Sequence, residues 1–300
     1  MSWPCPKGTV ADAMSTEPLW IGPDDTLDRA EVVMALAESR HVPVVLDGKL
    51  EGILSVRDML AGARLSRAPN TPRADYLHEV TVRQVMTAHP VVVCPGDDLV
   101  HAAQLLRKHS ISSLPVVSEG ELVGILTSSD LVEEAVRLLI EEERELGSAP
   151  LVSRIMKRRP TSTIDANGSV DLAAMLMKVG HFRHLPVMMG DLLVGMISDR
   201  DILAALGISP GERLQIARPA GSGPTAKEIM SARVRTTSPE AHAKDAGRAL
   251  LDWQIGALPV MERGKLMGIV TEADFLGYLI TCSPSEIDRE SAFHRGHSRP

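Results

Sequence analysis

A fourfold repeat with a period of about seventy residues limits the possible folds of this 300-residue sequence more than any other feature. Each repeat has a proline between apolar residues, a glycine nine residues later and an aspartate fifteen residues later. In chain order these positions are Pro43, Gly52 and Asp58; Pro115, Gly124 and Asp130; Pro186, Gly195 and Asp201; and Pro259, Gly268 and Asp274. A methionine stands about thirty residues before each proline, at Met14, Met86, Met156 and Met230. Both short spacings recur without a gap, so the chain consists of four versions of one unit.

Each repeat predicts the same order of elements, β-α-β-β-α. After the methionine comes a short extended stretch, such as residues 91–94, and then a helix with apolar residues at helical spacing, as in residues 99–106. The proline opens a β-branched strand, and a tight turn such as Asp47-Gly48 leads into a second strand. The last helix begins near the aspartate. The predicted fold class is therefore α/β (α+β).

A unit of this size cannot bury both faces of its own sheet, so we expect the repeats to pack in pairs, as two modules. The predicted domains are repeat one at 9–63, repeat two at 81–146, repeat three at 151–206 and repeat four at 225–280, with 281–300 as a mobile tail. A connector with two prolines at 64–80 and a connector with Pro and Gly at 207–224 pair repeat one with two and repeat three with four.

One long helix is predicted between the two pairs, over residues 130–146, where apolar and acidic residues alternate at helical spacing. It is either the ordinary last helix of repeat two, acting as a spacer, or a dimerisation element. The sequence leaves both interpretations open.

Composition excludes several classes of function. The net charge of −7 disfavours a nucleic-acid partner, and only 3% of the residues are aromatic, too few for a base-stacking platform. The three cysteines, Cys5, Cys94 and Cys282, form no CxxC pair, so neither a zinc site nor a disulfide framework is indicated.

The location and the absence of catalysis are further expectations. No apolar run approaches the ~18 residues of a membrane helix, and the first residues lack the apolar stretch of a secretory signal, so a cytoplasmic protein is expected. The sequence contains no GxxxxGK[ST], GxSxG or HExxH motif. We therefore expect no enzyme activity, no catalytic residue and no metal.

The methionine segment, the apolar-Pro-Val step and the Gly-apolar-apolar-Ser/Thr-x-x-Asp close resemble the signature of cystathionine-β-synthase-type (CBS) domains, over nearly all of residues 9–280. The resemblance implies repeats paired into Bateman modules that bind adenosine-bearing ligands such as AMP, ADP, ATP or S-adenosylmethionine. It implies that the module signals metabolic state to a partner protein, and that the chain is a homodimer. An adenine nucleotide would be a regulatory ligand, and no cofactor is obligatory.

The Ser/Thr-x-x-Asp motif suits such a ligand, because each motif ends a strand and opens a helix. A helix N-terminus and a hydroxyl donor favour phosphate, whereas an ionised aspartate accepts hydrogen bonds from the vicinal hydroxyls of a ribose. The resemblance assigns the same roles. The candidate phosphate-binding residues are Ser55, Arg57, Thr127, Ser198, Arg200 and Thr271, and the candidate ribose-binding residues are Asp58, Asp130, Asp201 and Asp274. The same spacing also forms a capping box, in which both side chains serve their own helix.

The four motifs are not equal. Arg57 and Arg200 either offset phosphate charge or are solvated charges at a helix end. On the first interpretation, repeats one and three rank first, repeat two next and repeat four last. Repeat three carries Asp199 beside its arginine, and repeat four carries Glu272 where a phosphate would approach.

Two further features have competing interpretations. His41 and His184 stand two residues before the proline in repeats one and three, but Ser113 and Ala257 replace them in the other repeats. Partly buried or pocket-rim histidines are therefore favoured over metal ligands. The basic run 157–159 fits a solvated loop, or a second contact to a polyphosphate.

Two functions stay open. One is a regulatory module that senses adenine nucleotides, and the other is a protein-interaction scaffold with vestigial nucleotide sites.

Overall fold

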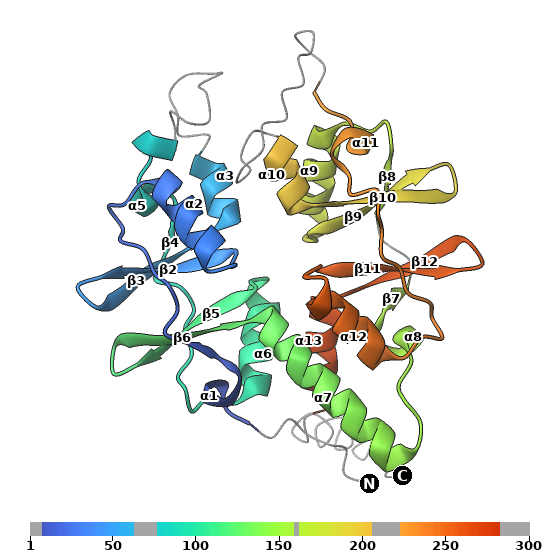
Figure 1. The fold of residues 1–300 in the computed structure, drawn as a ribbon, viewed down its shortest axis with the longest axis horizontal. Coiled ribbons are helices and arrows are strands. Elements are labelled where there is room, and N and C mark those ends of the chain that lie inside the picture. Colours follow the sequence, from blue (N-terminus) through green and yellow to red (C-terminus); the bar gives the residue numbers. More distant parts are fainter. Residues whose placement is uncertain (1–7, 63–76, 159–161, 206–222, 283–300) are drawn as a thin grey trace, which may run out of the picture.

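The computed structural model describes residues 8–62, 77–158, 162–205 and 223–282. Most of the two predicted connectors, residues 283–300 of the predicted tail, Cys5 and Arg159 lie outside these ranges. Short helices alternate with antiparallel hairpins throughout, so the predicted mixed α/β class is confirmed (Figure 1).

One hairpin forms the centre of each repeat, and it contains the proline and the glycine of the sequence pattern. The hairpins are β2 (His41–Leu46) with β3 (Lys49–Ser55), β5 (Ser113–Ser118) with β6 (Glu121–Thr127), β9 (His184–Met189) with β10 (Leu192–Ser198), and β11 (Ala257–Glu262) with β12 (Lys265–Thr271). Asp47 and Gly48 have the positive φ values, 49° and 79°, that a type I′ turn needs. The predicted turn is therefore present.

Two helices flank each hairpin. Before it come α2 (Leu27–Leu36), α6 (Leu99–His109), α9 (Val170–Gly180) and α12 (Ala243–Asp252). After it come α3 (Val56–Gly62), α7 (Ser128–Leu146), α10 (Asp199–Ala205) and α13 (Glu272–Thr281). The long helix predicted at 130–146 is α7, so that prediction is confirmed.

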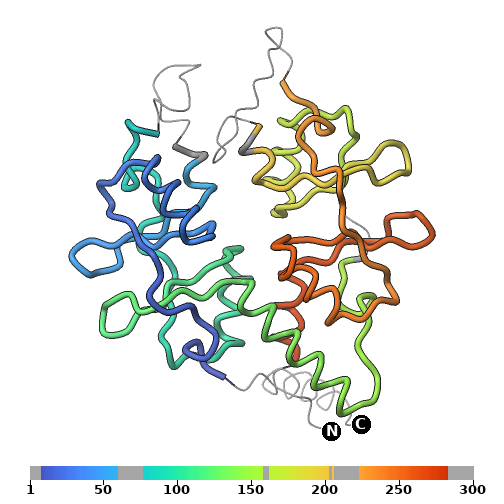
Figure 2. Tube along the Cα trace, viewed as in Figure 1, coloured from blue at the N-terminus to red at the C-terminus, as the bar shows by residue number. Residues whose placement is uncertain are grey.

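The segment around each repeat's methionine packs on the partner repeat, which the sequence interpretation did not foresee. These methionine segments begin with the one-turn helices α1 (Val10–Ala13), α5 (Val82–Val85), α8 (Val152–Ile155) and α11 (Ala226–Ile229). β1 (Ser15–Thr16) pairs with β6 of repeat two, β4 (Thr87–Ala88) with β3 of repeat one, and β7 (Lys157–Arg158) with β12 of repeat four. In Figure 2 the dark-blue first segment accordingly runs beside the green repeat two.

The expected extended stretch after each methionine is short. In repeat three it is β8 (Ile164–Asp165), parallel to β9. In the other repeats it contributes a single parallel bridge to the hairpin, at Ile21, Val93 and Thr237.

Strand pairing confirms the two predicted modules. The strands of repeats one and two join in one six-stranded sheet, in which β3 meets β6. Repeats three and four form two three-stranded sheets, and β7 of repeat three completes the sheet of repeat four. The two modules lie side by side in Figure 1, with α7 running from one toward the other.

The modules pack on each other within one chain. A single buried core spans repeats two and four, and it includes Leu131 and Leu139 of α7, Leu250 of α12 and Phe275 of α13. Helix packing is close here, because a Cβ on Gly247 would stand 2.4 Å from Cγ2 of Val136. The apolar face of α7 is therefore used inside the chain. Repeats one and three each keep a core of their own.

Candidate functional site

All four Ser/Thr-x-x-Asp motifs form capping boxes. In repeat one, the backbone N–H and the Oγ of Ser55 both donate to Oδ2 of Asp58, at 2.7 and 2.6 Å. The same pair of bonds joins Thr127 to Asp130, Ser198 to Asp201 and Thr271 to Asp274, at distances from 2.6 to 2.8 Å. These bonds use one carboxylate oxygen, Oδ2, so a ribose hydroxyl would bond to the other oxygen, Oδ1.

Burial makes three of these carboxylates costly to ionise. It raises the pKa of Asp58, Asp130 and Asp274, against the lowering effect of the bonds from their own serine or threonine. A ligand hydroxyl that donated to such a carboxylate would replace hydration lost on folding.

A cavity of about 400 Å³ opens at the start of α3, and this volume suits a small ligand. Repeat one supplies Ser55 and Asp58, and the methionine segment of repeat two supplies Thr87, next to His89 and Pro90. Apolar side chains complete the wall, namely Ile53, Val56, Val91 and Ile111. The methionine segment of repeat two, which pairs with the hairpin of repeat one, is therefore part of the site.

Arginines of both modules face this cavity. Arg40 and Arg57 come from repeat one, and Arg183 and Arg200 come from repeat three. Burial, together with the other guanidinium groups, lowers the pKa of Arg183 and of Arg200. The aspartates in the wall are Asp58 and Asp199, so the cavity holds four arginines against two carboxylates. An anion would relieve this crowding of positive charge.

Comparison with known families identifies the repeats. The family model described as "CBS domain" matches residues 10–63, 82–137, 152–208 and 226–281, which together make up most of the chain. This chain belongs to the CBS-domain family. The resemblance seen in the sequence is thereby confirmed.

Two archaeal relatives match most of this chain. The "Uncharacterized protein MJ1404" of Methanocaldococcus jannaschii is 26% identical over 281 residues, which cover 90% of this chain and 61% of that protein. The "Uncharacterized protein MJ1225" of the same organism is 24% identical over 273 residues, which cover 85% of this chain and 93% of that protein. This chain thus matches less than two thirds of MJ1404.

Two solved structures share the whole architecture. The crystal structure of MJ1225, described as a putative archaeal homolog of g-AMPK, has a TM-score of 0.73 at 21% identity and covers 90% of this chain and 99% of its own. An uncharacterized conserved protein from Pyrococcus horikoshii has a TM-score of 0.60 at 23% identity, with the same coverages. These likenesses show the fold.

The structure brings four of the ten candidate residues together. Ser55, Arg57 and Asp58 of CBS repeat one line the cavity, and Arg200 of repeat three joins them from the other module. The other six, Thr127, Asp130, Ser198, Asp201, Thr271 and Asp274, cap their own helices and are absent from the cavity wall.

Sequence reasoning missed Arg40 and Arg183. Both stand three residues before the proline of their repeat, where repeats two and four have Ser112 and Gly256. This alternation between odd and even CBS repeats was the available signal. This position is positively charged in the odd repeats and uncharged in the even repeats, a difference that lies outside the Ser/Thr-x-x-Asp motifs.

His41 and His184 lie where odd and even repeats meet. The Nε2 of His41 is 3.1 Å from Oγ of Ser112, and the ring of His184 lies against Gly256, where a Cβ would stand 2.3 Å from Cε1. Burial and nearby arginines lower the pKa of His41 to about 3; burial is the main cause that lowers that of His184 to about 4. Both rings are therefore neutral near pH 7. Both residues are partly buried, and His41 also lines the cavity, in agreement with the expectation of partly buried or pocket-rim histidines.

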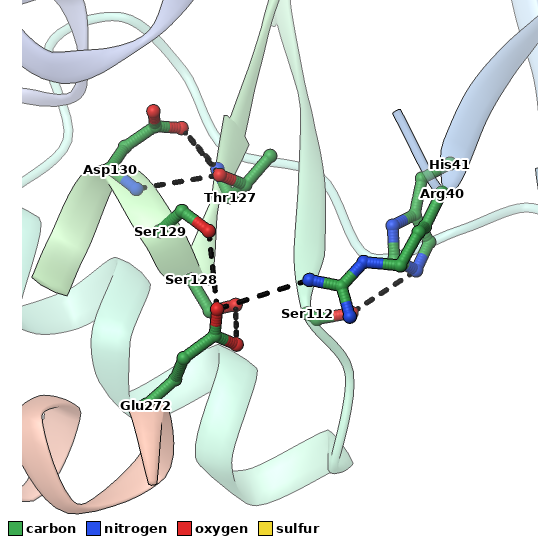
Figure 3. A network of polar contacts seen from close by, with 8 residues as sticks. All are labelled: Arg40, His41, Ser112, Thr127, Ser128, Ser129, Asp130 and Glu272. Carbon is green, nitrogen blue, oxygen red and sulfur yellow. Dashed lines mark hydrogen bonds and ion pairs between the residues drawn. The ribbon is translucent and has the colours of Figure 1, made fainter. Parts of the chain in front are cut away.

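Glu272 of repeat four crosses to the other module (Figure 3). Its Oε2 accepts from Oγ of Ser128 at 2.7 Å, and its Oε1 accepts from Oγ of Ser129 at 3.2 Å. A guanidinium nitrogen of Arg40 lies 3.9 Å from Oε1. A carboxylate thus already sits at the start of α7.

The described residues contain neither a candidate metal cluster nor a candidate membrane-spanning helix. Within residues 8–62, 77–158, 162–205 and 223–282, no group of three or more His, Cys, Asp or Glu side chains is placed to hold a metal ion. In the same ranges, no helix has both the length and the apolar character needed to cross a bilayer.

Proposed function

We propose that this CBS protein is a regulatory module that binds an adenosine-bearing ligand in the repeat-one cavity and signals its presence to a partner protein. The observation that carries the proposal is the cavity itself, because it brings the Asp58 carboxylate, a helix start and four arginines together around about 400 Å³. No catalytic step is part of the proposal. The cytoplasmic location, the homodimer and the lack of a nucleic-acid partner stay predictions.

The parts of the cavity match the parts of a nucleotide. The carboxylate of Asp58 would accept hydrogen bonds from the ribose hydroxyls, and Ser55 and the first turn of α3 would face the phosphate. The apolar groups of Ile53, Val91 and Ile111 offer a slot for the base. Adenine needs such a slot because its ring faces are apolar.

The charges in the cavity favour a ligand with more than one phosphate group. Arg183 and Arg200 belong to module two, so a chain of phosphates would reach from the helix start in module one to guanidinium groups in module two. Such a ligand would contact both modules at once. It would shift their relative arrangement by its difference in affinity for the two states, and a partner protein would respond to that shift.

One observation favours the scaffold alternative. Every Ser/Thr–Asp pair is already bonded within its own capping box, so the motifs have a structural reason to exist without a ligand. In that case the repeats would serve only as a rigid surface for a partner protein.

Calorimetric titration with AMP, ADP, ATP and S-adenosylmethionine separates the two functions. The panel includes ligands of other solved CBS proteins: CBSX2 is described in complex with AMP, and the CBS domain pair of MJ0100 in complex with 5-methylthioadenosine and S-adenosyl-L-methionine. At 100 times its dissociation constant, a ligand adds about 2.7 kcal/mol to the free energy of unfolding, so thermal melts provide a second readout. If none of the four ligands gave heat or changed the melting temperature, the nucleotide-binding function would fail and the scaffold function would remain.

Asp58→Ala and Asp274→Ala form a matched pair for this test. Both remove the aspartate of a capping box, but only Asp58 lines the cavity. D58A should weaken nucleotide binding by roughly 10- to 100-fold, as expected for lost hydrogen bonds to a charged group. D274A should bind like wild type. Equal affinities for the two variants would contradict the proposed site.

A further inference from the structure

The start of α7 in repeat two corresponds to the start of α3 in repeat one, yet the two are filled differently. At α3, the acid that crosses from module two is Asp199, which pairs with Arg57 at 3.0 Å beside the open cavity. At α7, the acid that crosses is Glu272, and its carboxylate accepts hydrogen bonds from Ser128 and Ser129. Asp199 and Glu272 occupy the same position in their repeats, thirteen residues after the proline.

The surroundings of the Glu272 carboxylate are those of a bound anion. Ser128 and Ser129 are the first two residues of the nineteen-residue helix α7, whose N-terminus carries partial positive charge. Two hydroxyl donors and the guanidinium of Arg40 complete the set. Glu272 is only 15% exposed and Ser128 only 5% exposed, so the carboxylate has largely exchanged water for these partners.

Chain length explains the difference between the two places. Glutamate has one methylene more than aspartate, and this lets the carboxylate of Glu272 reach both hydroxyls. In repeat one, the residues equivalent to the two serines are Val56 and Arg57, and the shorter Asp199 contacts the guanidinium instead. The wall of the repeat-one cavity then keeps four arginines against two carboxylates.

We propose that Glu272 is a built-in anion that occupies the phosphate position of CBS repeat two and keeps a nucleotide out of that repeat. The contact also ties α13 of module two to α7 of module one. Because Glu272 is the first residue of α13, its charge opposes phosphate at the start of that helix as well. Arg40 faces both the Glu272 carboxylate and the repeat-one cavity, so the two places share one cation. This inference rests on the proposed function for the ligand of repeat one.

The test is the number of ATP molecules bound per chain, measured by calorimetry. Wild type should bind one ATP, and Glu272→Ala should bind two. Glu133→Ala is the control, because Glu133 is an exposed acid on α7 that pairs with Arg137, and this variant should bind one ATP. Adding S128A and S129A to E272A should return the number to one. An unchanged number in folded E272A would overturn the inference, as would a wild type whose second ATP is lost on S128A/S129A substitution.

Two further measurements distinguish a failure of this inference from unfolding of the variant and from a failure of the proposed function. If circular dichroism shows that E272A is unfolded, E272S also removes the carboxylate and its bulk and should gain the second ATP; a single ATP in folded E272S would then count against the inference. If wild type binds no ATP, the proposed function fails at repeat one. In that case ATP binding that appears in E272A and disappears with S128A/S129A still supports the built-in anion, and its absence refutes it.

Discussion

The sulfur of Met86 in repeat two packs directly against Gly52 in repeat one. A Cβ on Gly52 would stand 2.7 Å from Sδ of Met86 and 2.9 Å from the backbone oxygen of Thr87. The contact recurs between Met14 and Gly124, also at 2.7 Å, and between Met230 and Gly195. The methionine and the glycine of the sequence pattern are therefore two halves of one contact between paired repeats.

Gly52→Ala should destabilise module one. The nearest atoms include backbone of β4, which cannot move without disturbing its pairing with β3, so overpacking should cost ~1–3 kcal/mol in the free energy of unfolding. Gly96→Ala is the control, because a Cβ there meets no atom within 4 Å. Its effect should be neutral or slightly stabilising, by less than ~1 kcal/mol. Urea unfolding of both variants is the measurement, and equal stabilities would refute the packing argument.

The sequence alone predicts the helices and strands of this fold well, but not the packing of each methionine segment on the partner repeat. Hairpins and helices follow from local patterns, such as the turn at Asp47-Gly48 and the apolar spacing that makes α7 a single helix. Gly52 has no such local reason, because it lies in a strand and not in a turn. Its requirement comes from Met86, thirty-four residues away, and no pattern within one repeat displays that contact.

The candidate site shows the same division. Ser55 and Asp58 are predictable because one motif at a helix start contains both. Arg183 is not, because it reaches the repeat-one cavity only through the packing of module two on module one. The sequence ranked repeats one and three as separate sites, whereas the structure places Arg200 of repeat three in the wall of the repeat-one cavity.

Arg183→Gln should weaken ATP binding without weakening adenosine binding. The side chain lies among other arginines in the cavity wall, so its role there is to meet negative charge. Loss of one charged hydrogen bond should reduce ATP affinity roughly 10- to 100-fold. Arg137→Gln, on the exposed side of α7, is the control and should bind ATP like wild type. An equal loss for ATP and adenosine would indicate a disturbed cavity instead of a lost phosphate contact.

Tyr278→Phe should weaken the packing of α13 on α7. The Tyr278 hydroxyl donates to the carboxylate of Glu142, which is only 1% exposed and also pairs with Arg154. Burial and this carboxylate raise the pKa of Tyr278, so the hydroxyl keeps its proton. Removing the donor from a buried carboxylate should cost ~1–3 kcal/mol. Urea unfolding measures the loss, and it should be smaller in an E142Q background, where the acceptor carries no charge; an equal loss in both backgrounds would contradict the charged bond.

Acid should destabilise this protein through His41 and His184, the two half-buried histidines between the repeats. In the unfolded chain each imidazole takes up a proton below about pH 6.5, but in the folded chain His41 does so only near pH 3 and His184 only near pH 4. Between these values the unfolded state binds more protons, so the free energy of unfolding falls as the pH falls, by up to ~1.4 kcal/mol per pH unit for each histidine. The raised pKa values of Asp58, Asp130 and Asp274 act in the opposite sense. The difference between wild type and variant therefore isolates the histidines.

His41→Asn and His184→Asn are the variants for this measurement. His41 faces Arg40, Arg183 and Arg57 as well as Asp199, and His184 faces Asp199 and Glu272 as well as Arg183 and Arg40. An asparagine is neutral at every pH, and at position 41 it can still bond to Ser112. Each variant should therefore show a shallower loss of stability below pH 6.5 in urea unfolding. His101→Asn, an exposed position on α6, should keep the wild-type slope. If H41N and H184N also kept it, neither imidazole would resist protonation in the folded protein, and the enclosure of both rings between the repeats would be wrong.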